Sequence, residues 1–149
     1  MGSANGMENY NERLVKYAGA LGLSDDVVFT GHIKFSEILA YYHVADAFVC
    51  MSEHEGLCVP LVESMFFGVP IIAYDTSAIS ETLGGSGVLL DSNDPVFAAA
   101  VIDRVVKDEK LRKSLIEGQR KRLEYFSYDR LKDIFTDCLT GFIEGRKGK

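Results

Sequence analysis

The sequence predicts one α/β domain with a largely parallel sheet and helices on both of its faces. Short apolar runs alternate along the chain with stretches of helical periodicity, an order that favours parallel pairing of strands. The run 47–51 is apolar throughout, as in a strand that is buried on both faces. The 149 residues suffice for one domain, and 47% hydrophobic and 26% charged residues are typical of a chain with a packed core.

The expected elements follow one another without a repeat or a linker. Leu14, Ala18 and Leu21 share one face of the first expected helix, which Gly22 ends. Helices are predicted over 8–21, from Ser36, over 60–67, from Pro95 and twice more before the C-terminus, and strands over 27–30, 47–51, 70–74 and 87–90.

Two of these helices carry local signals of their own. Asp94 followed by Pro95 is typical of an N-cap and a first helical position, so a helix is expected to begin there. The last helix is expected to gather its apolar side chains on one stripe, formed by Leu131, Ile134, Phe135, Cys138, Leu139 and Phe142.

Charge and cysteine content narrow the class of protein. The formal net charge of −6 argues against a nucleic-acid backbone as partner, because neutralising phosphates requires a basic surface. The three cysteines, Cys50, Cys58 and Cys138, suggest no disulfide framework and include no CxxC pair, which fits a reducing compartment. The sequence shows no apolar run long enough to cross a bilayer. We therefore expect a cytoplasmic protein without an integral membrane segment.

Ligands of parallel α/β sheets bind at the carboxyl ends of the strands, a rule that points to residues 52–63. Gly56 permits close approach of the backbone to a ligand. The helix expected from Pro60 directs its free N–H groups at the preceding loop, and such a helix end attracts phosphate. Glu63 can accept two hydrogen bonds from a ribose diol, and Glu55 can hold sugar hydroxyls. The segment therefore predicts a site for phosphate and diols, as in a sugar nucleotide.

Spacing alone does not single out Glu55 and Glu63. Glu109 and Glu117 are separated by the same number of residues, but they lie in helical sequence without a loop between them. We interpret this second pair as part of a solvated face. The first pair differs by its context, in which a buried strand is followed by a glycine-containing loop and a helix that starts with proline.

Residues 55–65, EGLCVPLVESM, and residues 68–73, GVPIIA, carry a more specific pattern. They resemble the signature E-G-F-G-x-P-x-x-E-A-M-A-x-G-x-P-V-I-A of retaining GT-B glycosyltransferases, the glycosyl transferases group 1 family. The resemblance continues at Val27-x-Phe29-Thr30-Gly31, at Tyr41 with Ala47 and Met51-Ser52, and over 81–87, ETLGGSG, so that it spans residues 7–126.

This resemblance implies a Rossmann-like fold, the C-terminal half of a GT-B enzyme, and it implies roles for individual residues. In that family the first glutamate contacts the donor sugar, so Glu55 becomes the candidate catalytic residue, and the second glutamate binds the ribose, a role that falls to Glu63. The remaining expected donor-binding residues are Gly56, Leu57, Cys58 and Val59 beside sugar and diphosphate, Gly31, His32 and Ile33 beside the base, and Ser52 and His54. The resemblance implies a UDP-, GDP- or ADP-sugar as donor, with no metal and no cofactor.

The sequence also departs from the family. Cys58 stands where a glycine is common and adds bulk beside the diphosphate. The resemblance further implies that two strands, with a diphosphate-binding Arg and Lys between them, and an N-terminal acceptor-binding domain are missing. Residues 1–6 are then a tag or, as we favour, a native loop after the second missing strand, and 7–149 form a partial nucleotide-sugar-binding domain. Such a fragment is expected to be inactive by itself.

Several side chains admit a second interpretation. His54 is favoured as a loop residue over a general base. Cys50, His54 and Cys58 recur every four residues, but Cys50 lies on a strand, so one helical face cannot unite them and no metal site is expected. A basic stretch is interpreted as a solvated face, with contact to anionic lipid in the parent protein as the alternative, and comprises Lys107, Lys110, Arg112, Lys113, Arg120, Lys121 and Arg122.

The predicted function is donor binding in a retaining glycosyltransferase that moves a sugar from a nucleoside-diphosphate sugar to a hydroxyl acceptor. Two other functions stay open. A nucleotide-sugar epimerase of the same fold would change the donor without an acceptor, and a non-catalytic sugar-nucleotide-binding or scaffolding module would bind without turnover. A dinucleotide-dependent dehydrogenase is disfavoured, because no GxGxxG motif follows a strand.

Overall fold

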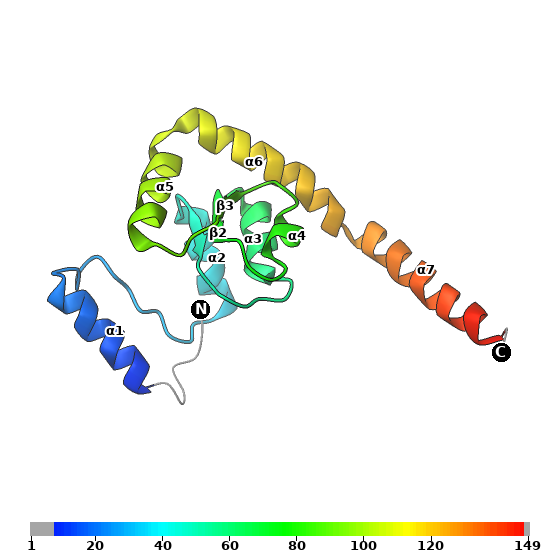
Figure 1. Cartoon of the computed structure of the whole chain (residues 1–149), viewed down its shortest axis with the longest axis horizontal. Helices are drawn as coiled ribbons and strands as arrows, with labels where there is room; N and C mark the ends of the chain where they lie inside the picture. Colours follow the sequence, from blue (N-terminus) through cyan, green and yellow to red (C-terminus); the bar gives the residue numbers. More distant parts are fainter. Residues whose placement is uncertain (1–7, 148–149) are drawn as a thin grey trace. The chain divides into compact units, whose positions relative to one another are not determined.

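A computed structural model describes residues 8–147, and its centre is a three-stranded parallel sheet. The strands are β1 (Phe48–Cys50), β2 (Ile71–Tyr74) and β3 (Val88–Leu90), in the order β1-β2-β3. Phe48 is in register with Ile71, and Ile72 with Val88. The predicted parallel α/β sheet is therefore confirmed, with strands slightly shorter than the apolar runs that predicted them (Figure 1).

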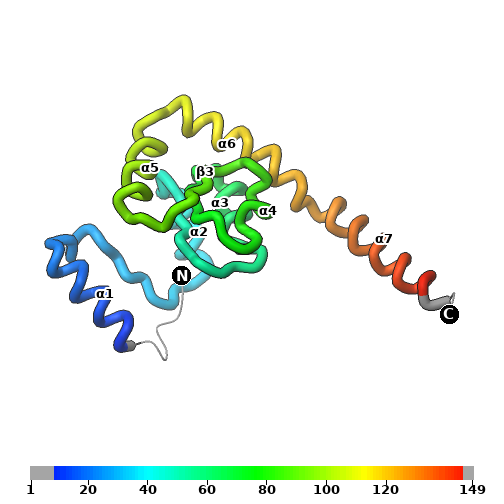
Figure 2. Tube along the Cα trace, in the orientation of Figure 1, coloured from blue at the N-terminus to red at the C-terminus, as the bar shows by residue number. Residues whose placement is uncertain are grey.

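Helices cover both faces of this sheet. These helices are α3 (Val59–Phe67), α4 (Ile79–Leu83), α5 (Pro95–Lys107) and α6 (Glu109–Leu123). The 3-10 turn η1 (Glu124–Phe126) and helix α7 (Tyr128–Lys147) follow α6 in the chain. The alternation of side chains along β2 divides the core in two, because Ile71 and Ala73 point to one face and Ile72 to the other. The first face packs against α3 and α4, which lie side by side, and the second packs against α5 and α6 (Figure 2).

The chain divides into two units between Tyr41 and Tyr42, inside helix α2 (Phe35–Val44). The first unit contains α1 (Glu8–Ala20), which confirms the first expected helix. The second contains the sheet. Residues 1–6, expected to be a tag or a native loop, lie outside the described residues.

The prediction of a strand over residues 27–30 is wrong. Among the described residues these four form no strand, and the sheet consists of β1, β2 and β3. Val28 is 72% exposed, which is the opposite of a buried central strand. A strand requires a neighbour to which its backbone can donate and accept hydrogen bonds, so β-branched composition is insufficient without such a partner.

Helix α4 was not among the helices expected from the sequence. It is one and a half turns long, and its C-terminus is held from another element. The guanidinium of Arg122, on α6, donates hydrogen bonds to the backbone oxygens of Thr82 and Glu81. A cationic side chain at this end satisfies carbonyls that the short helix leaves without partners.

Helix α7 confirms the last expected helix, and its predicted apolar stripe is exposed. Phe135 is 68% accessible to solvent, and Leu131, Ile134 and Leu139 are each nearly half accessible. In Figure 1 the helix, orange to red, extends beyond the sheet. The stripe therefore contributes little to the core of this unit.

Candidate functional site

The candidate site is the loop between β1 and α3, at the carboxyl edge of the sheet. The N-cap residue of α3 is Cys58, in the left-handed conformation with φ 54° and ψ 69°, and no side chain caps this end. Pro60 occupies the first turn, where its missing N–H costs nothing. Because the first amides of a helix carry partial positive charge, an end without a side-chain cap favours an anionic ligand.

Hydrogen bonds from the segment after β2 hold the loop in place. The hydroxyl of Thr76 donates to the Ser52 carbonyl at 2.9 Å, and the hydroxyl of Thr82 donates to the Leu57 carbonyl at 2.9 Å. Ser77 Oγ lies 3.3 Å from His54 Nδ1. The loop is therefore anchored at its start, middle and end by side chains from one neighbouring segment.

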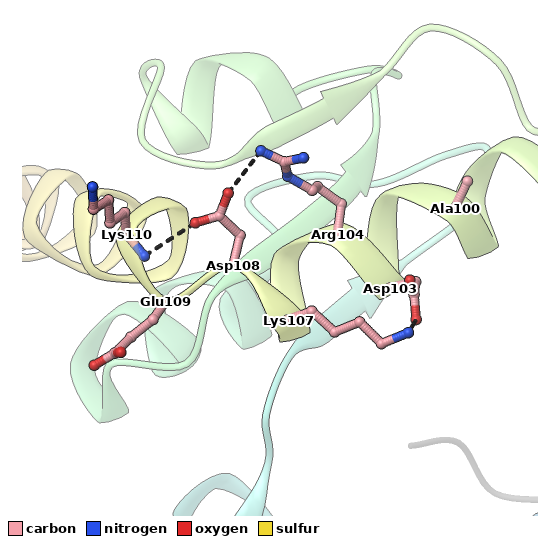
Figure 3. Close-up of a pocket in the computed structure, with 7 residues that line it drawn as sticks. All are labelled: Ala100, Asp103, Arg104, Lys107, Asp108, Glu109 and Lys110. Atoms are coloured by element: carbon pink, nitrogen blue, oxygen red, sulfur yellow. Dashed lines mark hydrogen bonds and ion pairs between the residues drawn. The ribbon is translucent and has the colours of Figure 1, made fainter.

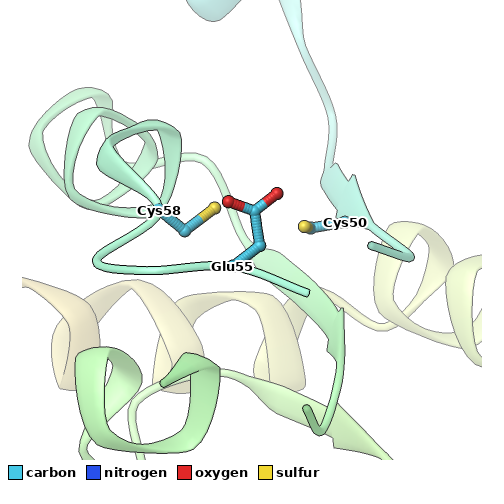
Figure 4. Close-up of side chains that lie close together, drawn as sticks. All are labelled: Cys50, Glu55 and Cys58. Carbon is cyan, nitrogen blue, oxygen red and sulfur yellow. The ribbon is translucent and has the colours of Figure 1, made fainter. Parts of the chain in front are cut away.

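Glu55 lies between two cysteines. Its carboxylate and the sulfurs of Cys50 and Cys58 all lie within 4.8 Å of one another (Figure 4). Cys50 ends β1, and its thiol is 3.6 Å from the hydroxyl of Ser52. Burial, with the nearby Cys50 and Glu55, raises the pKa of the Cys58 thiol to about 12, so that this thiol is neutral at physiological pH.

Glu63 lies in the second turn of α3 and is half-buried. Its Oε2 accepts a hydrogen bond of 2.9 Å from the hydroxyl of Tyr42. Burial first, and then this bond to a carboxylate, raise the pKa of the Tyr42 hydroxyl above its ordinary value. The ring of Tyr42 stacks on Phe67 with centroids 5.3 Å apart. Tyr42 thus holds one oxygen of the Glu63 carboxylate in a fixed position.

The structure places most of the sequence-predicted residues on one stretch of chain. The loop from Ser52 to Cys58 and the first residue of α3 contain Ser52, His54, Glu55, Gly56, Leu57, Cys58 and Val59. Gly31, His32 and Ile33 belong to the other unit, so their expected place beside the base stays a prediction. His54 is exposed and bonded to Ser77, which supports its interpretation as a loop residue.

Sequence reasoning missed the side chains that support the loop. Tyr42 is one of them, and the hydroxyl that reaches Glu63 has no signature in the sequence. Thr76 and Thr82 were not selected, although polar residues after a strand at the ligand-binding edge are a usable signal. Sequence reasoning also did not foresee that Cys50 and Cys58 meet beside Glu55, because a strand end and a helix N-cap bring them together without a shared helical face.

The basic stretch on α5 and α6 is largely the solvated face that was expected. Lys107 pairs with Asp103 at 2.6 Å, Lys113 with Glu109 at 2.7 Å, and these cations are about three-quarters exposed. Arg122 is a correction, because it lies against α4 as described above.

A shallow hollow of about 780 Å³ lies where α5 meets α6 (Figure 3). Its lining is mostly charged and already paired, for example Arg104 with Asp108 at 2.7 Å. Its residues come from α5, α6 and Asp108 between them, so it shares no side chain with the loop between β1 and α3.

Comparison with known proteins decides the family. The family model described as glycosyl transferases group 1 matches residues 4–122. The chain belongs to this family. It is 30% identical over 135 residues to the D-inositol 3-phosphate glycosyltransferase of Salinispora arenicola, covering 87% of this chain and 30% of that protein. It is 24% identical to the serotype-specific mannosyltransferase WbdA of Escherichia coli, covering 91% of this chain and 17% of that protein.

Solved structures agree on the fold. The C-terminal domain of a group 1 family glycosyl transferase, LpcC from Francisella tularensis, is similar with a TM-score of 0.67 and 25% identity, covering 78% of this chain and 61% of that one. Sucrose-phosphate synthase from Thermosynechococcus elongatus is similar in fold with a TM-score of 0.77 and 22% identity, covering 92% of this chain and 35% of that one. The chain therefore has the fold of a GT-B C-terminal domain.

The chain spans about 30% of the length of the curated inositol-phosphate glycosyltransferases that it matches. None of the helices between residues 8 and 147 has the length and apolarity needed to span a bilayer.

Proposed function

We propose that this domain binds the nucleoside-diphosphate sugar of a glycosyltransferase that transfers the sugar, with retention, to a hydroxyl acceptor. Family membership supports sugar transfer in general. The donor-binding role rests on the geometry between β1 and α3. The proposed donor is a UDP-, GDP- or ADP-sugar, and the proposed transfer requires no metal ion.

The bond from Tyr42 to Glu63 is the observation that supports the proposal most. A carboxylate with one oxygen held at 2.9 Å by a tyrosine hydroxyl keeps its second oxygen for another donor. A ribose presents two adjacent hydroxyls that can reach such a fixed acceptor. Without Tyr42 the side chain of Glu63 would have more freedom, and part of the binding energy would be lost in ordering it.

The amino end of α3 supplies the counterpart for the diphosphate. The backbone from Gly56 to Val59 ends in a helix without a side-chain cap, and Thr82 fixes the Leu57 carbonyl within it. Backbone N–H groups held in this way can bind phosphate oxygens without reorganisation. Glu55, at the start of this backbone stretch, is proposed to contact the hydroxyls of the donor sugar.

The 149-residue chain alone is proposed to lack transferase activity. In the family that the sequence resembles, reaction takes place between this domain and an acceptor-binding domain.

The test is Glu63→Ala in the enzyme that contains this domain, with donor binding measured by calorimetry against UDP-, GDP- and ADP-sugars. Hydrogen bonds to charged groups contribute about 1.5–3 kcal/mol, so we expect affinity for the preferred donor to fall by roughly ten- to a hundredfold. Glu117→Ala is the matched control, because Glu117 belongs to the equally spaced pair and is exposed. Unchanged affinity in Glu63→Ala would refute the ribose assignment.

Tyr42→Phe separates positioning from direct contact. This variant keeps the ring that stacks on Phe67 and removes only the hydroxyl. We expect donor affinity to fall by less than in Glu63→Ala, and we expect the double variant to be no weaker than Glu63→Ala alone. Additive losses would show that Tyr42 acts independently of Glu63.

A further inference from the structure

We propose that Cys50, Glu55 and Cys58 form a site for one thiophilic divalent cation, with Zn²⁺ as the natural candidate. Their three ligand atoms lie within 4.8 Å of one another and come from a strand end, a loop and a helix N-cap. In Figure 4 the carboxylate of Glu55 lies between the two sulfurs, and all three groups point toward a common centre. This cluster goes beyond the proposed function, which requires no metal ion.

The donor set fits Zn²⁺ better than a hard cation. Zn²⁺ binds thiolate sulfur at about 2.3 Å and carboxylate oxygen at about 2.0–2.2 Å in a tetrahedron, and three protein ligands leave the fourth position to water. Tetrahedral geometry at these lengths places ligand atoms about 3.4–3.8 Å apart, so closing from within 4.8 Å requires movement of about 1 Å. Mg²⁺ and Ca²⁺ prefer oxygen ligands only and are disfavoured.

Burial supports the site independently of the distances. Cys50 and Cys58 are each only 8% exposed, and Cys58 points its thiol at Glu55 (Figure 4). Glu55 is half-buried and belongs to the loop that Thr76, Ser77 and Thr82 anchor. Ligands that the fold already holds close together lower the cost of assembling a coordination shell.

Charge and proton balance are simple. Both thiols lose their protons as Zn²⁺ binds, so two Zn–S bonds form and two protons enter the solvent, while the Glu55 carboxylate contributes an oxygen ligand. The site then carries the +2 charge of the ion against three negative ligands. No oxidant or reductant takes part, and the ion leaves when the thiolates are reprotonated.

Occupancy of this site has a consequence that rests on the proposed function. If Glu55 holds the donor sugar, it cannot at the same time ligate the ion with the same oxygens. Zn²⁺ would then compete with the nucleotide sugar and inhibit transfer. The ion would act as an inhibitor of the domain, and transfer itself would still proceed without metal.

The experiment titrates the reduced 149-residue chain with Zn²⁺ and with Cd²⁺. We expect one ion per chain, release of about two protons per Zn²⁺, and the ultraviolet charge-transfer absorption of a cadmium–thiolate centre. A phosphine reductant that does not bind zinc keeps the thiols free. Absence of the cadmium–thiolate absorption, or proton release near zero, would overturn the proposal.

Variants assign the ligands. Cys58→Gly removes one sulfur and suits the left-handed backbone at that position, so the fold is expected to persist. We expect Cys58→Gly and Cys50→Ser to weaken Zn²⁺ binding by at least roughly 100-fold, and Glu55→Gln by roughly tenfold. Cys138→Ser is the matched control, because Cys138 is an exposed cysteine on α7. Binding that survives Cys58→Gly, or that is lost in Cys138→Ser, would contradict the assignment.

A competition arm tests the consequence separately. In the enzyme that contains this domain, Zn²⁺ is expected to raise the apparent dissociation constant of the donor, and Cys58→Gly is expected to remove this effect. Metal binding without any donor binding would leave the metal site intact and refute the proposed function. Donor binding that is indifferent to bound Zn²⁺ would refute the shared use of Glu55.

Discussion

The two ends of helix α3 differ in how they are capped. At its carboxyl end, Gly68 adopts a left-handed φ of 68°, its N–H and that of Val69 bond back to the helix, and Gln119 bonds to the turn that follows. At its amino end, Cys58 holds a left-handed conformation with no side-chain cap. The carboxyl end is closed by hydrogen bonds from within the fold. At the amino end no side chain accepts from the first amides, and the N–H of Leu61 bonds to the Cys58 carbonyl.

Two other helices of the same chain, α5 and α6, do have side-chain caps at their amino ends. Asp94 caps α5 by accepting hydrogen bonds from the N–H groups of Val96 and Phe97. Asp108 caps α6 in the same manner. Helix α5 also has proline in its first turn, so the absence of a cap on α3 does not follow from its proline. Side chains therefore cap α5 and α6, whereas α3 and α4, which both contact the loop between β1 and α3, have no side-chain cap.

The largest expected change in stability is at the carboxyl end of α3. Gln119 is 0% exposed, and it accepts from the N–H of Ile71 at 3.2 Å and donates to the carbonyl of Val69 at 2.7 Å. Gln119→Leu leaves both buried backbone groups without partners, so we expect a loss of about 2–4 kcal/mol in the free energy of unfolding, measured by urea denaturation. Glu117→Ala, on the same helix and exposed, is the control. A loss below about 0.5 kcal/mol would show that water replaces the side chain.

The next largest effect is expected when the side-chain cap of α5 is removed. Asp94→Ala is expected to lower the free energy of unfolding by about 1 kcal/mol, because two amides of α5 lose their acceptor. Donor affinity is expected to stay unchanged in this variant. If affinity fell as much as stability, the separation between capped and functional helix ends would be wrong.

A smaller change in stability, of opposite sign, is expected at the amino end of α3. Cys58 is one of two non-glycine residues with positive φ among those described. Cys58→Gly relieves this conformation at the cost of backbone entropy and a buried thiol, for a net gain of about 0.5 kcal/mol in unfolding free energy. Cys58→Ala keeps the conformation and serves as the matched control. Equal stability of the two variants would show that the backbone is not strained.

The smallest effect concerns pH. The bond from the Leu111 N–H first, and then Arg104, hold the pKa of Asp108 below its ordinary value of 3.8. A depressed folded-state pKa contributes stability above the unfolded value and loses it as pH falls through the folded value. Asp108→Asn should therefore flatten the decline in melting temperature in the acid range below pH 3.8. An unchanged acid profile would show that this cap does not depend on charge.

The sequence predicted the elements whose signals are local. Asp94-Pro95 predicted the start of α5, and the continuous apolar run predicted β1, because helix caps and burial on two faces leave a mark in a few adjacent residues. The strand expected over 27–30 failed, since pairing depends on a partner elsewhere. The meeting of Cys50, Glu55 and Cys58, the bond from Tyr42 to Glu63 and the return of Arg122 to α4 depend on tertiary packing. No rule based on the spacing of residues in the sequence predicts these three contacts.

Gln119 also determines how the domain opens. A single amide group joins α6 to the turn between α3 and β2, so α6 cannot detach without breaking both bonds at once. The amide proton of Ile71 is accordingly expected to exchange with solvent deuterium only when the whole sheet unfolds. We therefore expect helices on opposite faces of the sheet to melt in one cooperative transition.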